Sequence, residues 1–531
     1  MKINTTSSSP AHVHPPRFIL PLLAFIVATT FYLVFATGDL VAGFTSDDAV
    51  YLLLADLYMF AEQTHLPVYT LIREQSLFPP LFPLLLGLLG GGSNNIALSG
   101  LISTGLLLLS LMVAGRWMMQ QTQSLPLTLF LTALLLLLPG TLILAQEIWS
   151  EFLFMLLLYA IFFIAGRQDP RKYHWLIIAI LIAFATLTRT AGVALIPPFW
   201  LLLYRNRIRP FWLPAAISTL PFIAWYVPRE LLRQSPGYTS VLAAGTIEVG
   251  PSIALAGLAD KVIAMFDSLH WLFASVDSGS VHFWFGRIIL LLLLIPAASV
   301  MVRRIITFRI DALFCVVYGF IVLLWPHAEI YYVSRFLYPL VPIFLLYAGI
   351  GLAGNRAMKP IMFIPFIISV LVIMAPSVLQ FTQRATANVE EELKPYRRDR
   401  TWLLSTESNY TLLENTLFIV DTLQKIPGTI QPDECIYAFQ APLVMLYTKR
   451  VTGALPAPYV SDVQFQHDTA LCRYILALPV SDAGLDMPEY YPLQRLRASA
   501  YEQTAFYADP QAQYGTAIYL LRRFADTITP E

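Results

Sequence analysis

The apolar run HWLIIAILIAFATLTRTAGVALIPPFWLLL, at residues 174–203, decides the membrane topology of this chain. A membrane helix needs ~20 apolar residues, so the run predicts either one long helix or two short helices that turn at residues 188–192, TRTAG. With two helices, the basic loop residues gather on one side of the membrane, which the positive-inside rule assigns to the cytoplasm. With one helix, every later basic loop would lie outside, so two helices are favoured. The basic residues concerned are Lys2, Arg17, Arg116, Arg167, Arg171, Lys172, Arg205, Arg207, Arg209, Arg303, Arg304, Arg309, Arg356 and Lys359.

Composition agrees with a chain that lies mostly in a membrane. Of its 531 residues, 57% are hydrophobic and 13% are charged, against ~25% charged residues in soluble domains. The net charge is zero, so no basic excess indicates a nucleic-acid partner. We expect an all-α membrane bundle of about 11 transmembrane helices, with a cytoplasmic N-terminus, in a bacterial inner membrane. The apolar runs lie at 18–36, 95–114, 125–144, 150–166, 174–203, 211–228, 282–302, 310–327, 336–352 and 360–379.

Three long segments fall on the outer side of this topology: residues 38–94, 229–281 and 380–531. The last is polar and mixes helical patterns with short β-like runs. Residues 1–379 are therefore expected to form the membrane domain, and residues 380–531 a soluble α/β domain outside the cytoplasm. Within 229–281, apolar residues at helical spacing predict an amphipathic helix near 258–273, either a lid on the membrane surface or an ordinary packed helix.

Two of the three cysteines open short β-like runs in the soluble segment. If the runs at Cys435 and Cys472 form parallel neighbouring strands, their first residues lie side by side, within the ~7 Å between Cα atoms that a disulfide allows. A disulfide is expected there because thiols outside the cytoplasm are oxidised. The alternative is two buried free thiols, and Cys315 is expected to stay reduced.

The first outer segment begins with two adjacent acids, in TSDDAVY at residues 45–51. Carboxylates so close to a membrane are costly without a use. An alternative is purely structural, because Ser46 is a good N-cap and Asp47 and Asp48 would fill the first turn of a helix. Spacing alone leaves both interpretations open.

Further polar groups gather at the same outer depth. An arginine within a span costs ~2.5–3.5 kcal/mol on insertion scales, so Arg189 and Arg335 are expected to be paired, to reach the interface, or to bind an anion. The other candidates at this depth are Arg73, Glu147, Glu151, His327, Glu329 and Tyr332.

Taken together, these motifs resemble the integral-membrane glycosyltransferases of the GT-C fold, in the branch of protein O-mannosyltransferases and bacterial aminoarabinose transferases. The paired acids with a following aromatic, an acid at the start of the fourth helix, and an arginine between two short helices are features of that group. The matching elements are Asp47-Asp48 with Tyr51, Pro79-Pro80-Leu81, Glu147 or Glu151, Leu187-Thr188-Arg189-Thr190-Ala191-Gly192 and Arg335-Phe336-Leu337-Tyr338-Pro339.

The resemblance implies a transferase that moves a sugar from a polyprenyl-phosphate donor to a lipid, glycan or protein acceptor at the outer face. Asp47 would be the general base and Asp48 would orient it, with Glu147 and Glu151 as further catalytic candidates. Guanidinium groups bind phosphate as a fork, which suits Arg189, Arg335 and Arg73. The substrate-binding candidates are Tyr51, His327, Glu329 and Tyr332.

The sequence leaves open whether the protein needs a metal ion and which functional class it belongs to. A divalent ion held by Asp47, Asp48 or Glu147 with His327 is possible, but no spacing demands one. In the aminoarabinose branch an acid and a lysine precede the Pro-Pro, whereas this chain has Leu77-Phe78. A transporter or flippase of a lipid-linked saccharide is the alternative, although it should place charges near the midplane and show repeats. An oligosaccharide polymerase or ligase is a third option.

Overall fold

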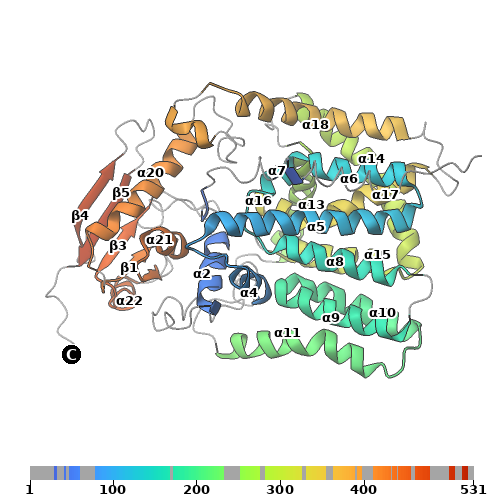
Figure 1. Cartoon of the computed structure of the whole chain (residues 1–531), viewed down its shortest axis with the longest axis horizontal. Helices are drawn as coiled ribbons and strands as arrows, with labels where there is room; N and C mark the ends of the chain where they lie inside the picture. The colour runs from blue at the N-terminus through green and yellow to red at the C-terminus, as the bar shows by residue number, and fades with distance from the viewer. Residues whose placement is uncertain are drawn as a thin grey trace, which may run out of the picture.

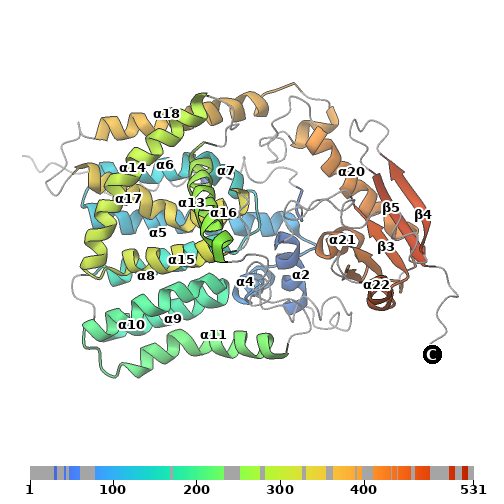
Figure 2. The same ribbon diagram turned by 180° about the vertical axis from the view of Figure 1, so that it is seen from behind.

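The computed structural model describes residues 29–30, 32, 41–43, 47–59, 78–167, 171–232, 251–274, 281–325, 330–353, 363–388, 391–396, 411–431, 433–438, 440–455, 461–478, 501–508 and 517–523. Long helices run side by side at one end of the molecule, and a small sheet forms the other end (Figure 1). Two shorter helices, α2 (Asp47–Met59) and α4 (Leu81–Leu88), lie between the bundle and the sheet (Figures 1 and 2).

The bundle is built from α-helices and short 3-10 helices, the latter labelled η. In chain order they are α5 (Ile96–Thr122), α6 (Leu125–Leu137), α7 (Pro139–Leu144), α8 (Glu151–Ala165), α9 (Lys172–Thr188), η2 (Thr190–Leu195), α10 (Ile196–Arg205), α11 (Trp212–Leu232), α13 (Pro251–Phe273), α14 (Val281–Ile306), α15 (Ile310–Leu324), α16 (Ile330–Leu337), η3 (Tyr338–Leu340), α17 (Val341–Ala353) and α18 (Phe363–Ala385).

Four helical stretches of the described residues are long and apolar enough to cross a membrane: Ile96–Thr122, Phe283–Ile306, Ile330–Leu352 and Ile367–Ala385. Other apolar helices are shorter, and a proline explains the shortness of one of them. The run at 125–144 breaks at Leu138, before Pro139, into α6 and α7, because the residue before a proline disfavours helical geometry. The helices identify an integral membrane protein, while about 11 crossings and their orientation stay a prediction. The run at 18–36 lies largely outside the described residues.

The run at 174–203 forms two helices, as predicted. α9 ends at Thr188, Arg189 is extended with φ −146° and ψ 137°, and η2 and α10 follow. η2 packs back onto α9 so closely that a Cβ atom at Gly192 would lie 2.6 Å from the Ala185 carbonyl oxygen. Glycine at this position lets the chain turn, and the break leaves the Arg189 side chain between two helices.

Aromatic side chains fill the centre of the bundle, where Trp117, Tyr159, Phe162 and Phe314 are buried and in ring contact. The outward faces are apolar as well, as the exposed leucines and isoleucines of α14 show. A helix that is apolar on all sides suits a lipid environment.

The expected amphipathic helix at 258–273 is part of α13. Its first half exposes Leu258, Val262 and Ile263, while Leu272 and Phe273 at its end are buried in the bundle core. Ordinary packing therefore accounts for the second half, and a lid role for the first half stays a prediction.

The C-terminal residues 411–523, which we call the sheet unit, carry a five-stranded sheet of order β2-β1-β3-β5-β4. β1 pairs in parallel with β2 and β3, and β5 pairs antiparallel with β3 and β4. α20 and α21 cover one face and α22 the other. That the unit is a separate domain outside the cytoplasm, divided from the bundle at 379/380, stays a prediction. The elements are η5 (Glu391–Tyr396), which precedes the unit, then α20 (Thr411–Lys425), η6 (Ile426–Gly428), β1 (Ile436–Ala438), α21 (Ala441–Thr448), β2 (Thr452–Ala454), α22 (Asp462–Asp468), β3 (Tyr474–Ala477), β4 (Tyr501–Ala508) and β5 (Ala517–Arg523).

The predicted disulfide is confirmed. Cys435 and Cys472 are bonded, with their Cα atoms 4.9 Å apart. Cys435 stands one residue before β1 and Cys472 two residues before β3, and these strands are parallel neighbours. Cys315 in α15 is a free cysteine.

Candidate active site

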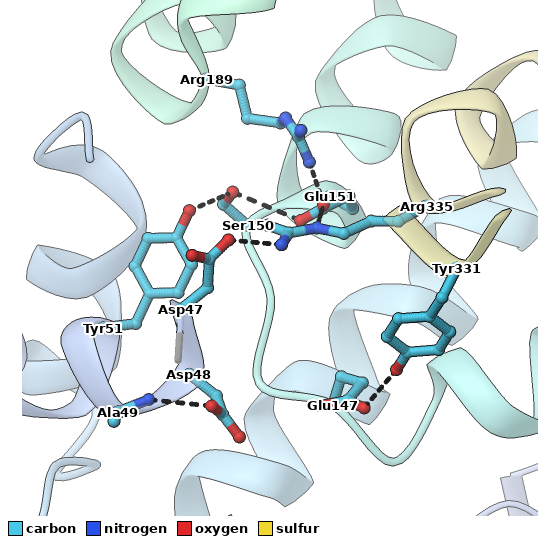
Figure 3. Close-up of polar contacts among 10 residues, drawn as sticks. All are labelled: Asp47, Asp48, Ala49, Tyr51, Glu147, Ser150, Glu151, Arg189, Tyr331 and Arg335. Carbon is cyan, nitrogen blue, oxygen red and sulfur yellow. Dashed lines mark hydrogen bonds and ion pairs between the residues drawn. The ribbon is translucent and has the colours of Figure 1, made fainter. Parts of the chain in front are cut away.

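The two adjacent acids open α2 and then diverge (Figure 3). Both stand in the first helical turn, where the helix dipole favours negative charge. The Asp48 carboxylate is buried and accepts hydrogen bonds from the backbone N–H groups of Gly43, at 2.8 Å, and Ala49, at 3.0 Å. Its contacts are those of a residue that fixes the start of the helix. Ser46, the expected N-cap, lies outside the described residues.

Asp47 instead joins a cluster of four charged side chains brought together from four parts of the chain. Arg335 of α16 donates through Nε to Glu151 and through Nη1 to Asp47, and Arg189 forms an ion pair with the same Glu151 carboxylate. Figure 3 shows the two arginines reaching Glu151 from different sides. The cluster holds two positive and two negative groups, so its formal charge is zero.

Burial within this charged cluster is uneven. The side chains of Glu151, Arg335 and Arg189 are 1%, 4% and 9% exposed, whereas that of Asp47 is 24% exposed. Asp47 is therefore the member that an incoming molecule reaches most easily. Burial raises the pKa of the Asp47 carboxyl above its usual range, and the Arg335 guanidinium opposes this rise.

Aromatic rings hold the two guanidinium groups in place. Arg335 lies over the Trp149 ring, 4.2 Å from its centroid, and Arg189 lies over the Phe336 ring at 5.3 Å. Cation–π contacts of this kind are strongest when they are removed from water. The arrangement fixes both positive charges beside Glu151, near the start of α2 (Figure 3).

Tyr51 lies next to the charged cluster and packs against the residues that flank the proline motif. The Tyr51 hydroxyl and the Ser150 hydroxyl are hydrogen-bonded at 2.7 Å, and Ser150 precedes Glu151 directly. The Tyr51 ring contacts Phe78 and Phe82 edge-on, one on each side of Pro79-Pro80. Tyr51 thus packs against α4, and its role in binding substrate stays a prediction.

Glu147 belongs to a second polar centre. Its carboxylate accepts a hydrogen bond of 2.6 Å from the Tyr331 hydroxyl, and the Tyr331 ring lies edge-on to Trp149 and Trp271. The Tyr331 and Tyr332 rings are neighbours in α16, with centroids 6.2 Å apart. Arg73, His327 and Glu329, the remaining candidates, lie outside the described residues.

The acids that the structure describes do not form a metal-ligand set. Within the described part of the chain, no three His, Cys, Asp or Glu side chains are grouped so that they could hold an ion. The carboxylates of Asp47, Asp48 and Glu147 bind an arginine, backbone N–H groups and a tyrosine, respectively. His327, the histidine expected to complete such a site, lies outside the described residues, so the divalent ion stays a prediction and no step is derived through one.

Ser150, Trp149 and Tyr331 contact the candidate residues, yet no role is predicted for them from the sequence. A signal was present, since Trp149 and Ser150 stand between the two acids Glu147 and Glu151. A tryptophan or serine between acids has many ordinary uses, so the pattern alone could not assign one.

Comparison with known proteins rests on structure alone. No family model matches the sequence, and no curated protein matches it either. The structure is similar to ArnT from Cupriavidus metallidurans in the apo state, with a TM-score of 0.52, 13% identity and coverage of 97% of this chain and 100% of that one. For ArnT bound to undecaprenyl phosphate the TM-score is 0.50, the identity 14% and the coverage 96% and 99%.

A weaker likeness, with a TM-score of 0.43, 11% identity and coverage of 95% and 74%, is to the oligosaccharyltransferase AglB from Archaeoglobus fulgidus. The match to ArnT spans nearly the whole length of both chains, bundle and sheet unit together. It confirms the fold that the sequence motifs predicted: this chain has the GT-C fold, in the form found in ArnT.

Proposed function

We propose that this chain is a membrane glycosyltransferase that moves a sugar from a polyprenyl-phosphate donor to an acceptor hydroxyl. One observation carries the proposal: two arginines bind the buried carboxylate of Glu151, and one of them, Arg335, also binds the partly exposed carboxylate of Asp47. The ArnT structure with undecaprenyl phosphate supports the lipid class of the donor. We place the reaction at the outer face of a bacterial inner membrane, with the N-terminus in the cytoplasm.

The reaction needs a base and a site for a phosphate. Asp47 takes the proton of the acceptor hydroxyl as that oxygen attacks the anomeric carbon of the sugar. The bond between this carbon and the phosphate oxygen breaks, and polyprenyl phosphate leaves. Arg335 and Arg189 bind the phosphate oxygens, because a guanidinium places two N–H donors on one phosphate.

Charge balance explains why Asp47 and Arg335 lie together. The donor phosphate is a diester, and its release as a monoester adds negative charge near neutral pH, since the second phosphate pKa is ≈ 6. Protonation of Asp47 in the same step removes one negative charge from the neutral cluster. Arg335 is thereby left with excess positive charge at the moment the leaving phosphate needs it.

Glu151 has a positioning role in this scheme. It is the most deeply buried of the four and binds both arginines, so it aims the two guanidinium groups at one point. We retain Tyr332 as a candidate for contacts with the sugar. We add Glu147, predicted above as a catalytic residue, and its partner Tyr331, because carboxylates and aromatic rings suit hydroxyl groups and C–H faces.

Binding of undecaprenyl phosphate to the purified protein tests the phosphate site. Arg335→Lys keeps the charge and loses the fork, and Arg189→Ala removes the group. Each should weaken binding roughly tenfold or more, as expected for losing a ~1.5–3 kcal/mol hydrogen bond to a charged group. Arg287→Lys is a matched control, since Arg287 also pairs with an acid and lies over aromatic rings, but in α14. Unchanged affinity in both site variants would refute the phosphate site.

Sugar release separates the proposed enzyme from a transporter. Undecaprenyl-phosphate hexoses and pentoses are supplied with a cell-envelope extract as acceptor, and free undecaprenyl phosphate is measured. A protein that moves these lipids across vesicles while releasing no sugar would be a flippase, and the proposal would be wrong.

A further inference from the structure

The sheet unit packs directly on α2, the helix that carries Asp47 (Figures 1 and 2). Val50, Leu53, Leu54 and Leu57 form a buried stripe at i, i+3, i+4 and i+7, and this stripe packs with Met445 of α21. On the other side of α2, Tyr51, Leu52 and Ala55 belong to the bundle core. The helix is thus held between the membrane bundle and the sheet unit.

A chain of contacts ties the sheet unit to the first turn of α2. The Tyr447 hydroxyl, near the end of α21, donates to the Ala42 carbonyl oxygen at 2.6 Å. The next residue, Gly43, donates its backbone N–H to the Asp48 carboxylate at 2.8 Å. Tyr447 therefore acts on the loop that fixes the residue beside Asp47.

Close packing reinforces this contact. Gly43 has φ +100°, and a Cβ atom there would lie 2.7 Å from Leu443 Cδ1 of α21. Side chains other than glycine are strained at such a φ. Glycine at this position therefore lets the loop adopt this turn and pack closely against α21.

A second chain of contacts ties the sheet unit to the far end of α2. Lys449, the residue that follows α21, donates through Nζ to the backbone and side-chain oxygens of Ser93 at 3.1 and 3.0 Å. The Ser93 N–H in turn donates to both oxygens of the buried Asp56 carboxylate at 3.2 Å. Opposite charges on Lys449 and Asp56 attract across this bridge.

We infer that α21 is a clamp that sets the position of α2, and that Tyr447 and Lys449 are positioning residues for Asp47. The inference rests on the proposed role of Asp47 as the base. A general base must lie within ≈ 2.6–3.2 Å of the proton it takes, and a misplacement of 1 Å can cost ~10²-fold in rate. The clamp holds α2 at both ends, while Arg335 binds Asp47 from the bundle side. The sheet unit accordingly helps to position the active site.

Three variants of the full-length protein test the clamp. Tyr447→Phe removes one hydroxyl, Lys449→Met removes the bridge to Ser93, and Lys449→Arg keeps the charge and donors. Lys425→Met is the matched control, because Lys425 lies in the same unit and pairs only with the exposed Asp421 among the described residues. The readouts are hydrogen exchange of the peptide covering residues 47–59, binding of undecaprenyl phosphate, and sugar release.

We expect Tyr447→Phe and Lys449→Met to speed exchange in residues 47–59 and to lower the maximal rate of sugar release roughly 10- to 100-fold. Undecaprenyl phosphate should bind as in the wild type, and Lys449→Arg should restore both exchange and rate. Wild-type exchange and rate in both variants would overturn the clamp. Failure of the proposed function has a different signature, because the wild-type protein would then release no sugar. Failure of the Asp47 assignment alone would leave Asp47→Asn releasing sugar normally.

Discussion

Arg335 donates to the Asp47 carboxylate although the two residues are 288 positions apart in the sequence. Its Nε also donates to Glu151, so one guanidinium joins the partly exposed Asp47 of α2 to the buried Glu151 of α8. Arg189 reaches the same Glu151 from the break between α9 and η2. The proposed base and the proposed phosphate-binding arginines are therefore joined by ion pairs. A substitution at one of these residues should change the position or charge of the others.

Removal of the base should abolish most activity. Asp47→Asn keeps the shape and loses the proton acceptor, so sugar release is expected to fall by ~10²–10⁴-fold at a normal protein level. Asp48→Asn should cost less, because its carboxylate binds backbone N–H groups and an amide oxygen can accept one of these bonds. A larger loss at Asp48 than at Asp47 would reverse the assignment.

The pH dependence should report Asp47. A base works only when it has lost its proton, and burial raises the pKa of this carboxyl, so activity should fall on acidification at a pH above the ~3.9 of an ordinary aspartate. Because Arg335 lowers that pKa, Arg335→Lys, with its weaker contact, should move the acidic limb to higher pH. The limb is measured from the maximal rate divided by KM across pH, and an unmoved limb would assign it to another group.

Stability should depend on Glu151. Glu151→Gln leaves the buried Arg189 guanidinium without its charged partner and leaves Arg335 paired with Asp47 alone. Breaking such a buried pair costs about 3–5 kcal/mol. Unfolding of the purified protein should shift accordingly, while Glu391→Gln, in an exposed pair with Lys394, should leave it unchanged. Equal stability of both variants would show that the cluster adds little to the folded state.

The disulfide should strengthen the sheet unit. It joins residues separated by 37 positions, which corresponds to ~3–4 kcal/mol in the chain-entropy model. Non-reducing mass spectrometry should find a peptide linking Cys435 to Cys472, and the double serine variant should unfold more easily. Free alkylation of both thiols under native, non-reducing conditions would contradict the bond and weaken the assignment of the unit to the outer side.

Topology can be tested by fusion. A reporter that is active only outside the cytoplasm should work when fused after Glu531 and be silent when fused at Arg207. The opposite pattern would reverse the orientation and place the cluster on the cytoplasmic face.

The sequence predicts local structure correctly where a single feature determines it. The TRTAG turn at 188–192 divides two helices as predicted, and the cysteine spacing found the bond between neighbouring strands. Strands β2 and β4 were not foreseen, since three residues of Thr-Gly-Ala and the mixed run Tyr501–Ala508 carry little apolar alternation.

The site was predictable as a set of residues and not as a set of contacts. Asp47, Glu151, Arg189 and Arg335 were all expected, but their pairing depends on contacts between distant segments. Asp48 points elsewhere because Gly43, in the preceding loop, offers it an N–H group. Glu147 and Glu151 stand four apart, yet they separate because residues 145–150 form turns and not a helix, so they bind different partners.

An experimental density map of the protein with undecaprenyl phosphate bound tests the proposed site most directly. The phosphate should lie within hydrogen-bonding distance of the Arg335 or Arg189 guanidinium, with the Asp47 carboxylate facing the side where the sugar would be attached. A phosphate bound elsewhere, in contact with neither arginine, would contradict the proposed mechanism.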